Sequence, residues 1–65
     1  MQAKYFSDTD TLLLTFSDND VVDSFDINED VLVEVDDQGR VVSMTIEHAQ
    51  RQTNVNAFTF ERVAV

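Results

Sequence analysis

The clearest pattern in the chain is an alternation of apolar and polar residues on both sides of its single glycine, Gly39. In residues 31–35 every second residue is valine, and in residues 42–46 every second residue is again apolar. A period of two is typical of a strand with one buried face. Glycine adopts a positive φ without steric cost, as a short hairpin loop requires. The pattern therefore predicts a β-hairpin with its turn at Gly39.

Shorter alternations, separated by polar turn residues, predict the remaining strands. They are expected over residues 3–6, 11–16 and 21–27. Good helix formers without a β-branched residue predict a short helix near residues 48–53. The tail, residues 52–65, alternates again around Phe58 and Phe60, which predicts an extra strand. The expected fold class is α+β, mostly β: a small antiparallel meander sheet of about four to five strands with one short helix.

The length of the chain, 65 residues, indicates a single small domain over residues 1–65. A chain of this size buries only about 60% of the surface that it exposes when unfolded, so its core is marginal. The main core is expected from one parity of the strands: Leu12, Leu14, Phe16, Val33, Val35, Met44 and Ile46. Without cysteine, disulfides cannot stabilise the domain. Self-association is another common source of stability, so we expect a homo-oligomer, most simply a dimer.

The charge of the chain limits its partners. Thirteen acidic residues and four basic ones give a formal net charge of −9. Nucleic acids and anionic membranes are bound through Lys and Arg clusters, so neither is expected as a partner. Three explanations of the acidity stay open: a solvated surface, an adaptation to high salt, and a docking face for a basic protein.

Targeting and membrane signals are not expected in this chain. The first ten residues lack a basic region followed by an apolar run. The longest uninterrupted aliphatic run, residues 12–14, is far shorter than the roughly 20 residues of a membrane helix. A cytoplasmic location is therefore the expectation.

Residues 4–51 resemble the family of short bacterial and archaeal proteins called domain of unknown function 2283 (DUF2283). Tyr5, Asp8 and Asp10 begin the match to the family's Tyr-Asp-x-Glu-Ala-Asp-Ala-Leu-like opening. Residues 31–42 match its Val-Ile-Val-Asp-Tyr-Asp-x-x-Gly-x-Val-Val run. The resemblance implies a small antiparallel sheet with a short helix, and it implies no activity.

Candidate chemistry is sparse. His48 is the only histidine, which excludes a multi-histidine metal site within one chain. Asp18 and Asp20 lack the following glycine of a calcium-binding loop, and turn formation explains such carboxylate pairs. One glycine cannot form a glycine-rich phosphate loop. We therefore expect no catalytic residue, no metal and no cofactor, and we do not expect an enzyme.

The remaining signal is an excess of apolar residues outside the inferred core. These residues, which we predict to form an interface, are Leu13, Leu32, Val41 and Phe25. A contiguous apolar patch on a sheet marks an interaction surface. The sequence thus favours a binding or structural module, either a homo-oligomer or a docking partner for a basic protein. The alternative is a ligand-binding or enzymatic domain whose site forms between subunits around His48.

Overall fold

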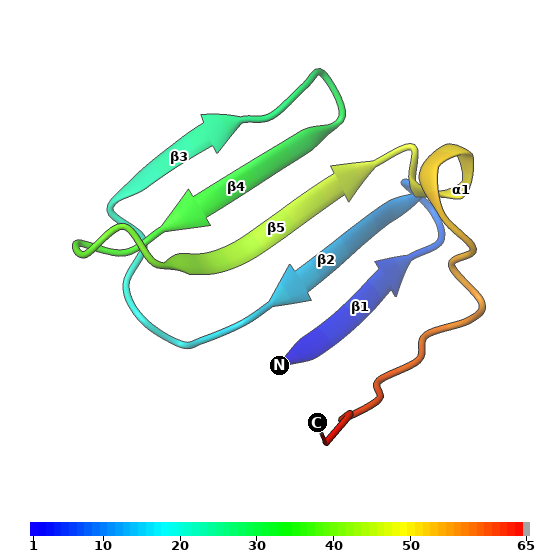
Figure 1. The fold of residues 1–65 in the computed structure, drawn as a ribbon. Coiled ribbons are helices and arrows are strands. Elements are labelled where there is room, and N and C mark those ends of the chain that lie inside the picture. Colours follow the sequence, from blue (N-terminus) through cyan, green and yellow to red (C-terminus); the bar gives the residue numbers. More distant parts are fainter. Residues whose placement is uncertain (65) are drawn as a thin grey trace.

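The computed structural model describes residues 1–64 and shows an antiparallel sheet followed by a short helix (Figure 1). The elements are β1 (Gln2–Phe6), β2 (Thr11–Thr15), β3 (Asp23–Asp26), β4 (Val31–Val35), β5 (Val41–Glu47) and α1 (Ala49–Gln52). The expected fold class, mostly β with one short helix, is confirmed. Within residues 1–64 no helix has the length and apolar character that crossing a membrane would need.

The strand order is β1-β2-β5-β4-β3, which is not the order of a meander. A meander would keep strands that follow each other in the chain side by side, but here β5 lies between β2 and β4 (Figure 1). The connection over residues 16–22 crosses the end of the sheet and carries β3 to the far edge. Backbone hydrogen bonds fix this crossing, from Phe16 N to Val42 O at 2.8 Å and from Val22 N to Val35 O at 2.9 Å. The meander prediction was therefore wrong, because only two of the three inter-strand connections within residues 11–47 are hairpins between paired strands.

One face of the sheet is apolar across all five strands. Residues directly opposite each other in antiparallel strands point to the same side. Two rows of such partners define what we call the apolar face: Ala3, Leu14, Met44, Val33 and Phe25 in one row, and Tyr5, Leu12, Ile46 and Val31 in the other. None of these side chains carries a charge at neutral pH. The faces of the strands are those that the alternation predicted.

The core is smaller than expected. The buried hydrophobic residues are Val33, Val35, Val42 and Ala49. The other predicted core residues on β2 and β5 are only half-buried, and Phe16 is 40% exposed. Among residues 1–64 no large side chain is completely buried. The core prediction was correct for Val33 and Val35 but wrong in assuming a covered sheet, because the short helix and the first residues of the tail lie over only part of the apolar face.

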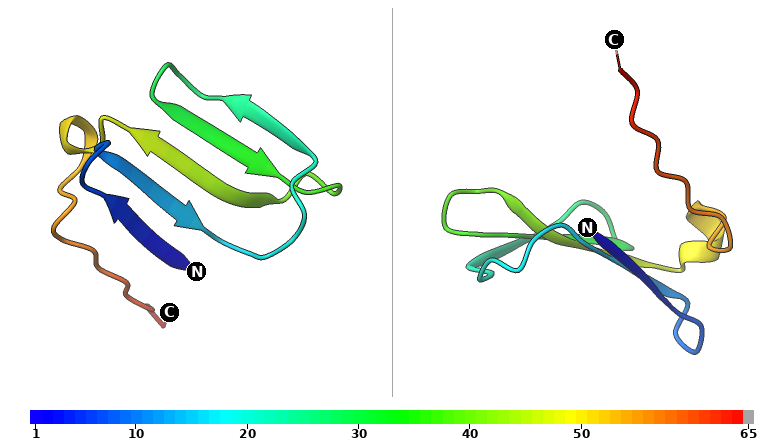
Figure 2. Two further views of the ribbon diagram at one scale, coloured as in Figure 1. Left: turned by 180° about the vertical axis from the view of Figure 1, so that it is seen from behind. Right: turned by 90° about the horizontal axis from the view of Figure 1, so that it is seen from below.

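The tail does not form the extra strand predicted for residues 52–65. Residues 53–64 leave α1 without regular structure and run beside β1 while rising away from the sheet (Figure 2). The backbone hydrogen bonds recorded for this part of the chain are local, such as Ala57 N to Asn54 O at 3.3 Å. A strand needs a ladder to its neighbour, and the described tail has none with β1. Val65 lies outside the described residues.

Candidate functional site

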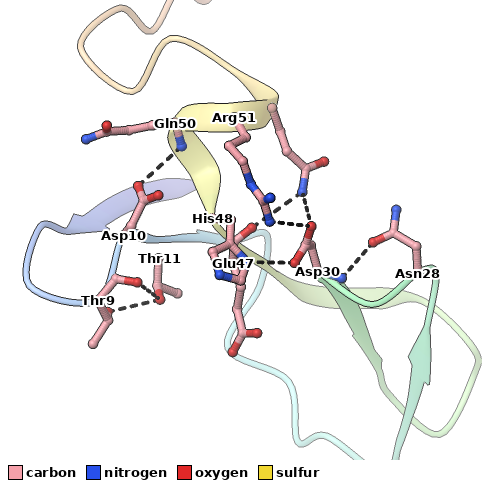
Figure 3. Close-up of polar contacts among 10 residues, drawn as sticks. Thr9, Asp10, Thr11, Asn28, Asp30, Glu47, His48, Gln50 and Arg51 are labelled. Atoms are coloured by element: carbon pink, nitrogen blue, oxygen red, sulfur yellow. Dashed lines mark hydrogen bonds and ion pairs between the residues drawn. The ribbon is translucent and has the colours of Figure 1, made fainter.

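Asp30 is the centre of a polar corner where the β3–β4 turn meets α1 (Figure 3). Its Oδ1 lies 2.8 Å from Nδ1 of His48, and its Oδ2 lies 3.7 Å from Nη2 of Arg51. Gln52 Nε2 donates to the same Oδ2 at 3.4 Å. A backbone hydrogen bond adds to these contacts, because Glu47 N donates to Asp30 O at 2.7 Å. One carboxylate thus ties both ends of the helix to the sheet.

Asp10, in the β1–β2 turn, holds the start of α1 from the other side (Figure 3). Its Oδ1 accepts from Gln50 N at 3.2 Å, and its carbonyl oxygen accepts from Ala49 N at 3.0 Å. The first N–H groups of a helix lack partners within the helix. His48, at the N-cap position, makes no side-chain capping bond. The cap therefore comes from a residue 40 positions earlier in the chain.

Tyr5 completes this corner. Its hydroxyl donates to Asp10 Oδ1 at 2.7 Å and accepts from Gln50 Nε2 at 2.9 Å. The hydrogen bond to the Asp10 carboxylate, with loss of solvent around the ring, raises the pKa of the Tyr5 phenol. The phenol is thus held in its neutral form, as a donor.

The polar contacts of this corner attach α1 to the sheet. His48 is exposed and its Nδ1 is occupied by Asp30. Within residues 1–64 no group of three or more His, Cys, Asp or Glu side chains is arranged to hold a metal ion. The polar contacts of the Asp30 carboxylate each join α1 or the preceding His48 to the sheet. The His48–Asp30 pair is therefore explained by its structural role, which is to attach α1 to the sheet.

A second carboxylate, Asp36, organises the β4–β5 loop. It is buried, and its Oδ1 accepts from the backbone N–H groups of Gln38 and Arg40, each at 2.9 Å. Its Oδ2 accepts from Asn19 Nδ2 at 3.0 Å. The Arg40 N–H, more than the other donors, lowers the pKa of Asp36. Gly39 has φ 77°, which confirms the turn predicted at this glycine.

The four residues predicted as an interface do not lie on one surface. Leu13 and Leu32 flank Thr45 on the side opposite the apolar face. Phe25 lies opposite Val33 and so belongs to the apolar face. Val41 is exposed beside the irregular pairing at the end of β4. The structure therefore brings together Leu13 and Leu32 and separates them from Phe25.

A groove between the apolar face and the tail was not predicted. It has a volume of about 350 Å³. Its lining consists of Ala3, Tyr5, Leu12, Leu14 and Ile46 from the sheet and Thr53, Asn54, Val55, Ala57 and Phe58 from the tail. Sequence reasoning missed the groove because it treated the apolar face as a core that the helix and tail cover. The polar Asn54 and Asn56, which break the apolar pattern before Phe58, are the signal that the tail does not continue the sheet.

The fold and these surfaces define a small acidic protein built on an open antiparallel sheet with a corner helix. A family model described as "Protein of unknown function (DUF2283)" matches residues 2–50. The match covers most of the chain, which belongs to this family, and it confirms the resemblance. It takes in all five strands and ends within α1, so the rest of the tail lies beyond it. No curated protein and no solved structure matches the chain significantly.

Proposed function

We propose that this protein is an acidic structural or binding module that works as a homo-oligomer, most simply a dimer. The observation that supports this is the amount of surface that one chain exposes. Its accessible surface is 5167 Å² for a mass of 7.4 kDa. A folded monomer of that mass exposes only about 4,200 Å² by the usual scaling of area with mass. The excess resembles the roughly 800 Å² that each partner buries in a standard protein interface.

The shape of the chain supports the same proposal. The radius of gyration is 12.9 Å. A compact domain of this length has a radius of about 10.8 Å. The difference reflects a single sheet without a second layer, together with a tail that rises from it (Figure 2). Packed domains consist of at least two layers around a core, and a second copy would supply the missing layer.

Docking to a basic protein is the other binding role that the surface supports. Asp18, Asp20 and Asp37 lie around an open depression beside the β4–β5 loop. The three side chains are exposed residues of a chain with net charge −9, so they would attract a basic partner. The alternative, a ligand-binding or enzymatic site between subunits, would start from His48, which is exposed and paired with Asp30.

Sedimentation or light scattering across a concentration series tests the proposed self-association. At micromolar concentration and about 0.15 M salt, we expect a mass of at least twice the 7.4 kDa of one chain. Association should tighten as salt increases, because screening weakens the repulsion between two copies of charge −9. A mass of 7.4 kDa at every concentration and salt would overturn the proposal.

A further inference from the structure

We infer that the apolar face is the contact between two copies of this chain, packed sheet against sheet, with Phe58 and Phe60 of each tail closing over the partner. This inference rests on the proposed self-association and names its surface. It places the contact on the side of Leu14 and Met44. The surface predicted from the sequence around Leu13 and Leu32 lies on the other side.

The two faces of the sheet differ in chemistry. On the three central strands, the apolar face presents only aliphatic side chains. On the other face, Leu13 and Leu32 share one row with Lys4, Thr45 and Asp26. In the next row, Ser43 Oγ donates to Glu34 Oε1 at 2.8 Å, so these polar groups already have partners. The apolar face is the better candidate for an interface. Burying it removes water from none of the charged groups on the central strands.

The exposed area on the apolar side suits a dimer. Phe25 is 52% exposed, Phe58 is 65% exposed and Phe60 is 71% exposed. At roughly 150–250 Å² for a Phe side chain, these three residues alone expose about 280–470 Å². The half-buried aliphatic residues between them bring the patch toward the roughly 800 Å² that each partner contributes to a standard interface. Phe58 borders the groove above β2, so the tail and the sheet form one continuous surface.

The distribution of charge favours a second copy over a basic partner on this face. The acidic residues lie in turns, on the other face, at edges or in the tail, and Asp23 on the edge strand β3 is the one that aligns with the apolar rows. A basic protein would find no opposite charge at the centre of the face. A second copy would find an apolar surface like its own, and both sets of acids would stay at the rim. Two sheets in such an arrangement lie about 10 Å apart.

The tail of the same chain does not take this place. Residues 58–64 rise from the sheet (Figure 2). A groove lies between the tail and the apolar face, so the tail does not fill this space. The tail's aromatic side chains are more exposed than any aliphatic residue of the apolar face. A partner sheet seated on the face would bury both the groove and these side chains.

Leu13 and Leu14 provide a matched test, since they are adjacent on β2, are both half-buried and lie on opposite faces. We expect Leu14→Glu to convert the oligomer to monomers, while Leu13→Glu keeps the parent mass. Light scattering gives the mass, and far-UV circular dichroism shows whether each variant keeps its strands. An oligomer that Leu13→Glu dissociates and Leu14→Glu leaves intact would overturn the inferred surface while the proposed self-association stands.

Tail variants test the inference without disturbing the sheet, in case Leu14→Glu does not fold. Phe58→Ser combined with Phe60→Ser should weaken the dimer roughly tenfold or more, as expected for buried aromatic anchors. The matched control combines Phe6→Ser with Val22→Ser, which are 45% and 60% exposed. Phe6 pairs with Thr11 on the other face and Val22 lies in the connection before β3, so this pair should leave the dissociation constant of the dimer unchanged. Equal effects of the two pairs would overturn the inference. A parent protein that stays monomeric would instead overturn the proposed function, and the inference with it.

Discussion

Two corners of the sheet are each organised by one aspartate carboxylate that accepts backbone N–H groups, but the donors come from different distances along the chain. In the β4–β5 loop, Asp36 accepts from Gln38 and Arg40, the farther of which is four residues away. At the helix corner, Asp10 accepts from Gln50, which is 40 residues away. The first arrangement can form within a hairpin. The second requires β1, β2 and β5 to be paired before the helix can be held.

The backbone conformations of the two corners differ as well. The β4–β5 loop uses glycine for its positive φ, at Gly39. The helix corner uses Asp10 at φ 54° and His48 at φ 53°, neither of which is glycine. Asp and His enter the left-handed region more often than most residues, but each costs conformational energy there. The helix corner is therefore the more strained of the two and depends on its tertiary contacts. Four predictions test this difference.

Asp36→Ala should cause the largest loss of stability. It leaves the N–H groups of Gln38 and Arg40 and the amide of Asn19 without their acceptor. We expect a large fall in the denaturant midpoint, measured by circular dichroism. Asp37→Ala is the control, because this neighbour is exposed and has the same charge. Similar midpoints for the two variants would mean that the Asp36 bonds contribute little.

Gly39→Val tests the backbone of the same loop. The space around Gly39 is open, with no atom within 4 Å of an added Cβ, so the cost comes from φ alone. We expect the free energy of unfolding to fall by about 1–3 kcal/mol. Gly39→Asn, which tolerates a left-handed conformation, should cost clearly less. A valine variant as stable as the asparagine variant would contradict the assigned turn.

Asp10→Gly tests the helix corner. Glycine removes the carboxylate and also relieves the strain of the positive φ, so the two effects partly offset each other. We expect a net cost of only about a few tenths of a kcal/mol, as for other replacements of a capping residue by glycine. Amide hydrogen exchange should quicken at Ala49 and Gln50 while the amides of β4 keep their protection. Faster exchange across the whole sheet would show that this corner is not a separate unit.

The smallest effects should come from pH, with opposite signs at the two corners. The pKa of Asp36 is lowered in the folded protein, so its contribution is present above about pH 4 and is lost as the pH falls through the folded pKa. The pKa of Tyr5 is raised, so its contribution is present below about pH 10 and is lost as the pH rises through the folded pKa. The free energy of unfolding should therefore vary less with pH at the acid end in Asp36→Asn. In Tyr5→Phe it should vary less at the alkaline end. A variant that keeps the parent's slope would contradict the assigned partner.

The features that sequence reasoning predicted are local ones. Alternation placed the five strands, and the lone glycine placed the turn at Gly39, because both depend on residues a few positions apart. The helix was predicted near residues 48–53 and is formed by Ala49–Gln52. Its attachment was not predicted, because no local pattern links Asp10 with Gln50.

The strand order and the candidate surface depend on long-range pairing. A meander was the simplest order for consecutive strands, yet β2 pairs with β5, and the partners Leu12 and Ile46 are far apart in the chain. Leu13 was chosen as an interface residue on the assumption that the opposite face is covered. Parity assigns a side chain to a face, but it does not say whether a second layer covers that face. Coverage of the face depends on the path of the tail, which rises from the sheet (Figure 2).

The central position of β5 also determines the order in which the protein can be completed during its synthesis. β5 is the last strand to leave the ribosome, and both β2 and β4 need it as a neighbour. Until it emerges, the nascent chain can form only two separate hairpins, β1–β2 and β3–β4. An isolated hairpin is marginally stable at best in water. The inner edges of both hairpins would then be open to pairing with other chains. The sheet is therefore expected to form in one late step, when β5 enters between the two hairpins.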